Sequence, residues 1–215
     1  MKIGVFGGTF NPIHYGHLRA AEETCEILGL DKVLFIPSGN PPLKSEDLAD
    51  ALKRYKMVRL AVVRNRSFDV LDIECLKSEK SYTVETLEVL LRQYRDAELY
   101  FMLGIDAFLD IPTWWRPEQL VSMVNFAVVS RPGREFGEML SSPYAKTKDL
   151  AESGRESLTL ELRSGRKAEL VKITPLDISS SDIRRRMRAG RSIKYLLPED
   201  VESFIISNKL YSPVQ

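Results

Sequence analysis

Two histidines three residues apart are the side chains of this 215-residue chain best suited to chemistry. His14 and His17 are its only histidines, and they follow the apolar residues 3–6 at the start of a helix expected over residues 16–28. The start of a helix offers unpaired N–H groups and the positive end of a dipole, which favour an anion. Imidazoles beside that start can hydrogen-bond phosphate oxygens, so the segment predicts a nucleotide-phosphate site.

Two glycines join the predicted strand to the histidines. Glycine lets the backbone approach a ligand and adopt φ > 0, so Gly7 and Gly8 are expected to aim amide N–H groups at the phosphate. Thr9 adds a hydroxyl donor. The segment matches neither the P-loop pattern G-x-x-x-x-G-K-[ST] nor the dinucleotide pattern G-x-G-x-x-G. An ordinary strand, turn and helix with two surface histidines is the alternative.

A second segment, residues 178–184, combines similar groups near the other end of the chain. It reads Ile-Ser-Ser-Ser-Asp-Ile-Arg, and serine before an acidic and an apolar residue signals a helix N-cap. The hydroxyls of Ser180 and Ser181, free amides and Arg184 would converge on an anion at that helix start. A capped, basic surface helix is the alternative interpretation.

Strand-like and helix-like stretches alternate along the chain, which predicts βαβ units in an α/β, Rossmann-like, doubly wound parallel sheet forming a single domain. Ligands bind outside the carboxyl ends of the strands in such sheets. Strands are predicted at residues 3–6, 33–37, 68–72, 99–103, 126–129 and 170–173, and helices at 16–28, 50–64, 83–94 and briefly near 107 and 118. Residues 133–167, charged and rich in Ser and Gly, are expected to form a solvated insertion; a lid or partner surface is the alternative.

Composition excludes several classes of protein. The net charge of +1 provides no basic field for nucleic acid or a membrane surface. Cys25 and Cys75 have the spacing of neither a zinc site nor a disulfide framework, and they are expected to be reduced core residues. The chain opens on a strand rather than a signal peptide, and no apolar run reaches transmembrane length. A cytoplasmic protein is therefore expected, and its oligomeric state stays open, a homo-oligomer included.

Both motifs resemble those of the HxGH nucleotidyltransferase superfamily. Residues 7–17 match the GGTF-x-P-x-H-x-GH form of nicotinate and nicotinamide mononucleotide adenylyltransferases, and residues 178–184 match ISSTxIR, with Ser181 in the threonine position. Residues 81–86 resemble the SYTxxT segment of the bacterial nicotinate mononucleotide enzymes. From Met1 almost to Tyr211, the chain is thus similar to the bacterial nicotinate-nucleotide adenylyltransferases, which make deamido-NAD⁺ from ATP and nicotinate mononucleotide.

Other functions stay open at this point. Phosphopantetheine adenylyltransferases and cytidylyltransferases share the HxGH signature, and a non-catalytic nucleotide sensor could use the same fold. A nucleic-acid-binding module is a further alternative, although the basic cluster at residues 184–188 is short and has no aromatic residues within it.

The resemblance implies a role for each motif residue. The catalytic residues would be His14, His17 and Arg184, and ATP would contact Gly7, Gly8, Thr9, His14, His17, Ser180, Ser181 and Arg184. The substrate-binding residues would be Lys44 of a PxxxPPHK-like loop, Tyr82 and Thr83 at the nicotinate carboxylate, Gly104 and Asp106 of a ribose-binding GxD element, Trp114 and Trp115 beside the pyridine ring, and Arg131 of an RPG turn.

Several of these residues could also have a simpler, structural role. Asp106 also suits a helix N-cap, and Thr83 could be a plain capping residue. The broad faces of Trp114 and Trp115 could sandwich a flat ring, or could pack in the core.

The chain departs from the family pattern at two positions. Leu43 replaces a histidine, and Asn11 stands where the family usually has aspartate. A neutral amide cannot supply charge to a metal, so no side chain is assigned as a metal ligand. Mg²⁺ is expected to arrive with ATP and to be held by phosphates and water.

Overall fold

A computed structural model describes residues 1–40, 48–77, 79–130, 133–147, 149–152 and 157–212. The residues group into two compact units, which are described separately. Unit 1 comprises Met1–Gly7, Ala20–Val33 and Tyr82–Pro175, and unit 2 comprises Gly8–Arg19, Leu34–Ser81 and Leu176–Gln215. Among the described residues the strand order of the eight-stranded sheet is β3-β2-β1-β4-β5-β8-β7-β6.

Parallel strands form the centre of unit 1. They are β1 (Lys2–Gly8), β4 (Glu98–Gly104), β5 (Asn125–Val129) and β8 (Lys167–Val171). The register pairs Phe6 with Met102, and Leu103 with Val128. These strands are almost continuously apolar because helices cover parallel sheets on both faces.

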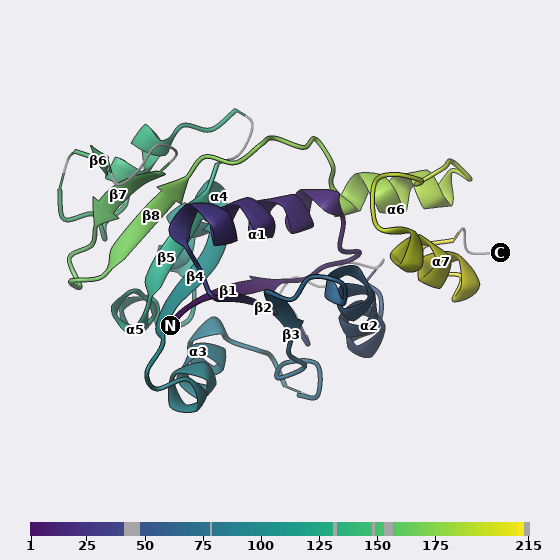
Figure 1. The fold of residues 1–215 in the computed structure, drawn as a ribbon, viewed down its shortest axis with the longest axis horizontal. Helices are drawn as coiled ribbons and strands as arrows, with labels where there is room; N and C mark the ends of the chain where they lie inside the picture. Colours follow the sequence, from purple (N-terminus) through teal and green to yellow (C-terminus); the bar gives the residue numbers. More distant parts are fainter. Residues whose placement is uncertain (41–47, 78, 131–132, 148, 153–156, 213–215) are drawn as a thin grey trace. The chain divides into compact units, whose positions relative to one another are not determined.

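Helices cover this part of the sheet on two sides. In Figure 1, the unit 1 part of α1 (Tyr15–Leu28) and α3 (Thr83–Gln93) lie on opposite sides of β1. Right-handed crossovers require this arrangement, because the strand order places β2 and β3 on one side of β1 and β4 on the other side. The shorter helices of unit 1 are α4 (Ile105–Leu109), η1 (Ile111–Thr113), α5 (Pro117–Met123) and η2 (Phe136–Ser141).

Unit 2 contains most of β2 (Lys32–Pro37), β3 (Phe68–Val70) and the first turn of α1. Its further helices are α2 (Ala51–Val62), α6 (Ser180–Arg188) and α7 (Glu199–Ser207). The Asp50 side chain caps α2 by accepting the N–H groups of Leu52 and Lys53. Helix α2 packs against β3 and α7, and Figure 1 shows α2 and α7 side by side.

Most predicted elements are confirmed to within a few residues. The largest difference concerns residues 133–167, which are more than a charged, solvated insertion. They contain η2, β6 (Ala151–Glu152) and β7 (Ser157–Glu161), and β7 pairs antiparallel with β8. Strand β8 also begins at Lys167, three residues earlier than predicted. Leu160 and Leu162 are fully buried, so this segment extends the sheet and contributes to the core of unit 1.

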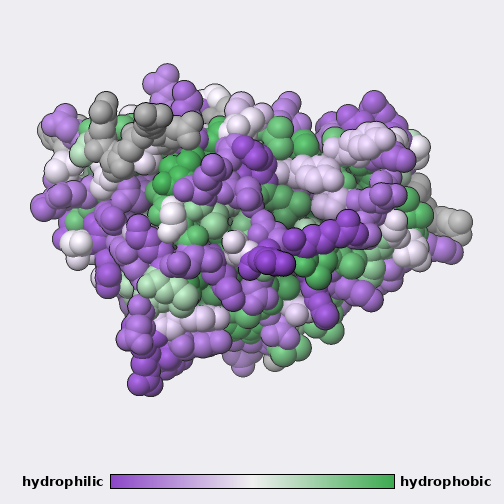
Figure 2. Space-filling model, in the orientation of Figure 1, coloured by the Kyte–Doolittle hydropathy of each residue, from purple (hydrophilic) through white to green (hydrophobic). Residues whose placement is uncertain are grey.

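The surface mixes hydrophilic and hydrophobic residues over the face shown in Figure 2. Large exposed hydrophobic side chains of the described residues include Trp115 in unit 1 and Tyr195 and Ile206 in unit 2. Scattered exposed apolar residues are normal for a globular protein. Trp115 nevertheless stands out because it belongs to the predicted pyridine segment.

Candidate active site

The phosphate loop, residues 9–17 of unit 2, follows β1, and the two glycines before it do not have the conformation predicted for them. Gly7 and Gly8 lie within β1, and neither has a positive φ; Phe10 has one, at 46°. A Cβ added at Gly8 would lie 3.0 Å from the Phe10 ring, and one at Gly7 would lie 3.3 Å from the Phe101 ring. The prediction of φ > 0 was therefore wrong: these glycines make room for aromatic rings.

The two histidines stack on each other at the start of α1. Their ring centroids are 3.7 Å apart, with 29° between the planes. The backbone N–H of His14 donates to Nδ1 of His17 over 3.3 Å, so Nε2 carries the proton of a neutral His17. A Cβ added at Gly16 would lie 3.0 Å from the His14 ring. The glycine between the histidines thus permits the stacking.

Burial sets the protonation state of His14. Its side chain is 5% exposed, and desolvation lowers its pKa from 6.5 to about 4. His14 is therefore neutral at pH 7. Its buried Nδ1 has no hydrogen-bond partner among the described residues. A buried polar atom without a partner is costly, and a ligand oxygen or water would satisfy it if Nδ1 carries the proton.

Helix α6 carries the second motif of unit 2. As predicted, a serine caps it: the Ser179 hydroxyl accepts the N–H of Asp182 over 3.1 Å. The Ser180 hydroxyl donates to the carbonyl of Pro12 over 2.8 Å, and Nη1 of Arg184 donates to the carbonyl of Asn11 over 2.8 Å. These two bonds join the start of α6 to the phosphate loop. Ser181 is exposed in the first turn.

The guanidinium of Arg184 retains binding capacity after this contact. Its buried Nε has no hydrogen-bond partner among the described residues. A partly buried arginine with a donor that lacks a partner suits phosphate oxygens, because guanidinium and phosphate form charge-assisted hydrogen bonds. Unit 2 thus brings together His14, His17, Ser180 and Arg184, as the sequence predicts.

Arg54 supports the phosphate loop from within unit 2 and was not among the predicted site residues. Its side chain is fully buried, and its three donor nitrogens each reach a backbone carbonyl. Nη1 donates to Thr9 over 2.8 Å, Nη2 to Gly39 over 2.8 Å, and Nε to Ala49 over 2.9 Å. One buried cation therefore connects three backbone segments, with its N–H groups well satisfied.

Asn11 has a structural role in the phosphate loop. Its side-chain Oδ1 accepts the N–H of Ala49 over 3.1 Å and the hydroxyl of Tyr211 over 2.6 Å. The oxygen that an aspartate would offer to a metal is thus already engaged by two donors. Asn11 does not fit the role of a Mg²⁺ ligand.

The predicted pyridine segment belongs to unit 1 and is built from aromatic contacts. The rings of Tyr82 and Trp115 lie 4.5 Å apart at 31°, and the Arg116 guanidinium lies 4.0 Å from the centre of the Trp115 ring. Trp114 instead meets the edge of Phe101, at 6.3 Å and 76°. Each tryptophan therefore has its own packing partner, whereas the sequence suggested a shared sandwich for a flat ring.

Two helix starts lie within unit 1 at the predicted positions. Thr83 is the first residue of α3, whose N-cap is Tyr82. Gly104 ends β4 and is the N-cap of α4, so Asp106 is not the cap that the sequence suggested. Asp106 is the second residue of α4, where its carboxylate pairs with Nε of Arg134 over 2.8 Å. A carboxylate in the first turn still complements the helix dipole.

Comparison with known proteins identifies the family. The profile of the cytidylyltransferase-like family matches residues 5–186. A "probable nicotinate-nucleotide adenylyltransferase" of Pelobacter propionicus is 43% identical over 99% of both chains, and one of Geobacter sulfurreducens is 42% identical over 99% of both. The chain belongs to the nicotinate-nucleotide adenylyltransferase family.

Solved structures with the same fold include two of the Plasmodium falciparum nicotinic acid mononucleotide adenylyltransferase, one complexed with APC and one with NaAD. Each has a TM-score of 0.74 and 21% identity, and the alignments cover 98% of this chain and 96% or 97% of the other. The Rossmann-like α/β fold is therefore confirmed. As a member of this family, the chain is a nucleotidyltransferase of NAD biosynthesis.

Two residues that the family pattern assigns to substrate lie outside the described residues. These are Lys44 and Arg131. The remaining assigned residues of this family member divide between the units. Gly8, Thr9, His14, His17, Ser180, Ser181 and Arg184 belong to unit 2, and Gly7, Tyr82, Thr83, Gly104, Asp106, Trp114 and Trp115 belong to unit 1. Their roles in binding stay predictions.

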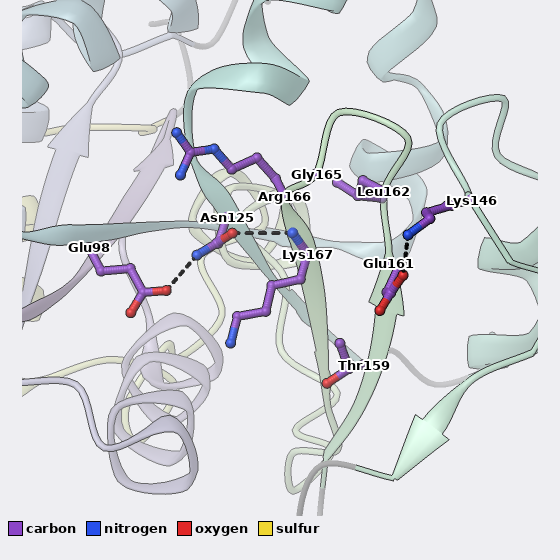
Figure 3. Close-up of a pocket in the computed structure, with 9 residues that line it drawn as sticks. All are labelled: Glu98, Asn125, Lys146, Thr159, Glu161, Leu162, Gly165, Arg166 and Lys167. Carbon is purple, nitrogen blue, oxygen red and sulfur yellow. Dashed lines mark hydrogen bonds and ion pairs between the residues drawn. The ribbon is translucent and has the colours of Figure 1, made fainter.

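A cavity of about 440 Å³ lies elsewhere in unit 1 (Figure 3). Three of its lining residues, Glu98, Asn125 and Lys167, are the first residues of β4, β5 and β8. It therefore lies at the amino ends of the parallel strands, whereas nucleotides bind at the carboxyl ends. Figure 3 shows Lys146 paired with Glu161 over 2.8 Å, and Asn125 donating to Glu98 over 2.7 Å. These contacts account for much of the lining charge without a nucleotide.

The described residues of this family member lack two kinds of feature. In that part of the chain, no group of three or more His, Cys, Asp or Glu side chains is arranged to hold a metal ion. Among the same residues, no helix is both long enough and apolar enough to cross a membrane.

Proposed function

We propose that the protein transfers the adenylyl group of ATP to nicotinate mononucleotide, forming deamido-NAD and releasing pyrophosphate. The observation that carries this proposal is the convergence of His14, His17 and Arg184 on one loop of unit 2, in a chain of this family. These three side chains present hydrogen-bond donors in and beside the first turns of two helices, where phosphate is favoured.

The reaction needs no protein nucleophile. A phosphate oxygen of nicotinate mononucleotide attacks the α-phosphorus of ATP and forms the new P–O bond. The bond from the α-phosphorus to the oxygen bridging it to the β-phosphorus breaks, and that oxygen leaves with pyrophosphate. No proton has to be removed from the attacking oxygen. Catalysis then consists of positioning the two phosphates and neutralising the charge that develops on their oxygens.

The protonation states of the donors suit this task. His17 offers Nε2–H because its Nδ1 accepts a backbone N–H. His14 is neutral at pH 7, so it provides one N–H donor and no positive charge. Arg184 supplies the permanent charge, and Thr9, Ser180 and Ser181 contribute hydroxyls. We assign His14 and His17 to the phosphates of ATP, and Thr9 to the orientation of the reacting phosphates. Arg184 with Ser181 is assigned to the departing β and γ groups.

Mg²⁺ would accompany ATP rather than occupy a site built by the protein. The predicted phosphate-binding side chains of unit 2 are neutral or cationic, which suits an anion, and Asn11 Oδ1 is already engaged. Mg²⁺ prefers oxygen ligands and retains several waters, so phosphate oxygens would hold it. It would lower the negative charge of the triphosphate when bound.

Unit 1 supplies the features expected for the pyridine nucleotide. The first N–H groups of α3, at Thr83 and Val84, have no partner within the helix and favour a carboxylate such as that of nicotinate. Trp114 and Trp115 offer aromatic surface for the pyridine ring, and Asp106 offers a carboxylate for a ribose hydroxyl. We extend the proposal to a cytoplasmic protein without nucleic-acid or membrane partners, with its oligomeric state open.

The test is pyrophosphate release with ATP and Mg²⁺, with nicotinate mononucleotide, nicotinamide mononucleotide and phosphopantetheine compared as acceptors at equal concentration. We expect the nicotinate form to be used most efficiently. Equal use of the amide would retain the chemistry but overturn the role of the α3 start. Activity with phosphopantetheine alone would reassign the chain to another reaction of the superfamily.

A further inference from the structure

Tyr211 follows α7 and lies far from the phosphate loop in sequence, yet the two are in contact. The Tyr211 hydroxyl donates to Oδ1 of Asn11 over 2.6 Å, although 200 residues separate them. Burial raises the pKa of this tyrosine, so the hydroxyl stays protonated and remains a donor at neutral pH. Asn11 itself is only 4% exposed. A buried amide oxygen with two donors holds its loop firmly, because losing either donor leaves hydrogen-bonding capacity unsatisfied.

The end of α7 turns the chain toward this contact. The N–H of Lys209 bonds the carbonyl of Ile206, and the N–H of Leu210 bonds the carbonyl of Ile205. Lys209 has φ 51°, which completes a Schellman motif in which Leu210 is buried. Tyr211 follows with φ 60°, a conformation that bulky residues rarely adopt. Such a backbone persists only where its surroundings hold it, and strained positions of this kind often serve function.

The residues around Asn11 bear directly on the proposed chemistry. The carbonyl of Asn11 accepts Nη1 of Arg184, and the carbonyl of the next residue, Pro12, accepts the hydroxyl of Ser180. His14 lies two residues beyond Pro12. The position of Asn11 therefore sets where the donors of α6 and the stacked histidines stand.

We propose that Tyr211 is a positioning residue for adenylyl transfer, acting through the side chain of Asn11 to hold the phosphate loop in its reactive arrangement. This rests on the proposed function. It also predicts that an aspartate could serve at position 11, because its carboxylate offers an oxygen that can accept the N–H of Ala49 and the hydroxyl of Tyr211. On this account, position 11 needs an acceptor rather than a charge.

Four variants test the proposal. Tyr211→Phe removes the hydroxyl alone, and Tyr195→Phe is the matched control, because Tyr195 also lies in unit 2 but is 81% exposed. Asn11→Asp retains an accepting oxygen, and Asn11→Leu removes it at similar volume. We expect kcat/KM for ATP to fall at least 10-fold in Tyr211→Phe and Asn11→Leu, since small misplacements of reacting groups are costly. Tyr195→Phe and Asn11→Asp should stay within about 3-fold of wild type, because both retain the acceptor and its donors.

Two further readouts separate positioning from a general loss of structure. The dissociation constant of nicotinate mononucleotide should be unchanged in Tyr211→Phe, whereas a general loss of fold would weaken it. The chain holds two histidines, so ring ¹⁵N spectra report on the loop directly. Both sets of signals should shift in Tyr211→Phe and stay in place in Tyr195→Phe.

The outcomes are distinct. Wild-type kcat/KM and unshifted histidine signals in Tyr211→Phe would overturn the positioning role, even if that variant unfolds at a lower temperature. Inactivity of the wild-type protein with nicotinate mononucleotide would instead overturn the proposed function, and the histidine signals would still decide whether Tyr211 positions the loop.

Discussion

The phosphate loop of unit 2 and the aromatic segment of unit 1 are held in place by different forces. Hydrogen bonds of two buried side chains fix the loop: the Arg54 guanidinium donates to three carbonyls, and Asn11 accepts from two donors. Ring contacts hold the aromatic segment, whose Trp115 remains 38% exposed. Hydrogen bonds from charged groups are directional and each contribute about 1.5–3 kcal/mol, whereas an aromatic pair adds about 0.5–1.5 kcal/mol with looser geometry.

This difference matches the demands of the two substrates. A triphosphate must be aligned in line with its attacker, so its donors need fixed positions before binding. A pyridine ring needs a flat apolar surface, which side chains can complete on binding. We therefore expect changes in the phosphate loop to affect turnover or folding, and changes in the aromatic segment to affect substrate affinity.

The largest effect should come from Arg54→Met. This change removes the buried guanidinium that donates to three backbone carbonyls, and we expect the free energy of unfolding to fall by about 3–5 kcal/mol. Arg59→Met is the control, because Arg59 is exposed on the same helix and should change stability by less than about 0.5 kcal/mol. Urea unfolding measures both. Equal effects would show that the buried guanidinium does not hold the loop.

His17→Ala should be the most damaging change to turnover among folded variants. Loss of one preorganised donor costs about 10²-fold or more in kcat, equivalent to about 3 kcal/mol. Steady-state kinetics with saturating substrates measure the effect, and circular dichroism confirms the fold. A well-folded variant with wild-type kcat would remove His17 from the mechanism.

Acid should destabilise the phosphate loop through His14. Its pKa is about 4 in the folded chain and 6.5 as an ordinary value, so between these pH values only the unfolded chain is protonated. Stability therefore falls as pH falls from 6.5, and the loss from this residue reaches about 3 kcal/mol near pH 4.

Urea unfolding midpoints at pH 7 and pH 4.5 measure this loss of stability with falling pH. His14→Asn should lose less stability over that interval than the wild type does. Parallel losses in both proteins would mean that His14 is not buried in its neutral form.

The smallest effect should come from Trp114→Ala. We expect KM for nicotinate mononucleotide to rise about 10-fold, since base stacking on an aromatic side chain contributes about 1–3 kcal/mol. KM for ATP should change little, because Trp114 is assigned to the pyridine ring and not to ATP. Equal changes in both KM values would mean that Trp114 supports the fold through Phe101.

The sequence predicted the parts of this protein that depend on local pattern. Apolar runs located the parallel strands, and the HxGH and serine motifs located the residues that meet in unit 2. The positive φ predicted for Gly7 and Gly8 was wrong, because close packing against Phe10 and Phe101 depends on which rings approach these glycines. The local sequence around the two glycines does not show which aromatic rings will pack against them.

Two features escaped prediction for different reasons. The sequence around Arg54 does not distinguish it from an exposed basic residue of an amphipathic helix. Its side chain is buried only because α2 packs against the rest of unit 2. Strand β7 had a usable signal, since Leu158, Leu160 and Leu162 alternate with polar residues, but the charged surroundings obscured it. The contact between Tyr211 and Asn11 joins distant residues, and no spacing rule predicts it.

The central claim is that the α-phosphorus of ATP is attacked by the phosphate of nicotinate mononucleotide, and isotopic labelling tests it most directly. With ATP labelled in the α-phosphoryl group, the account predicts that all transferred label appears in deamido-NAD and that pyrophosphate is unlabelled. Label in pyrophosphate, or release of inorganic phosphate without a dinucleotide product, would contradict it.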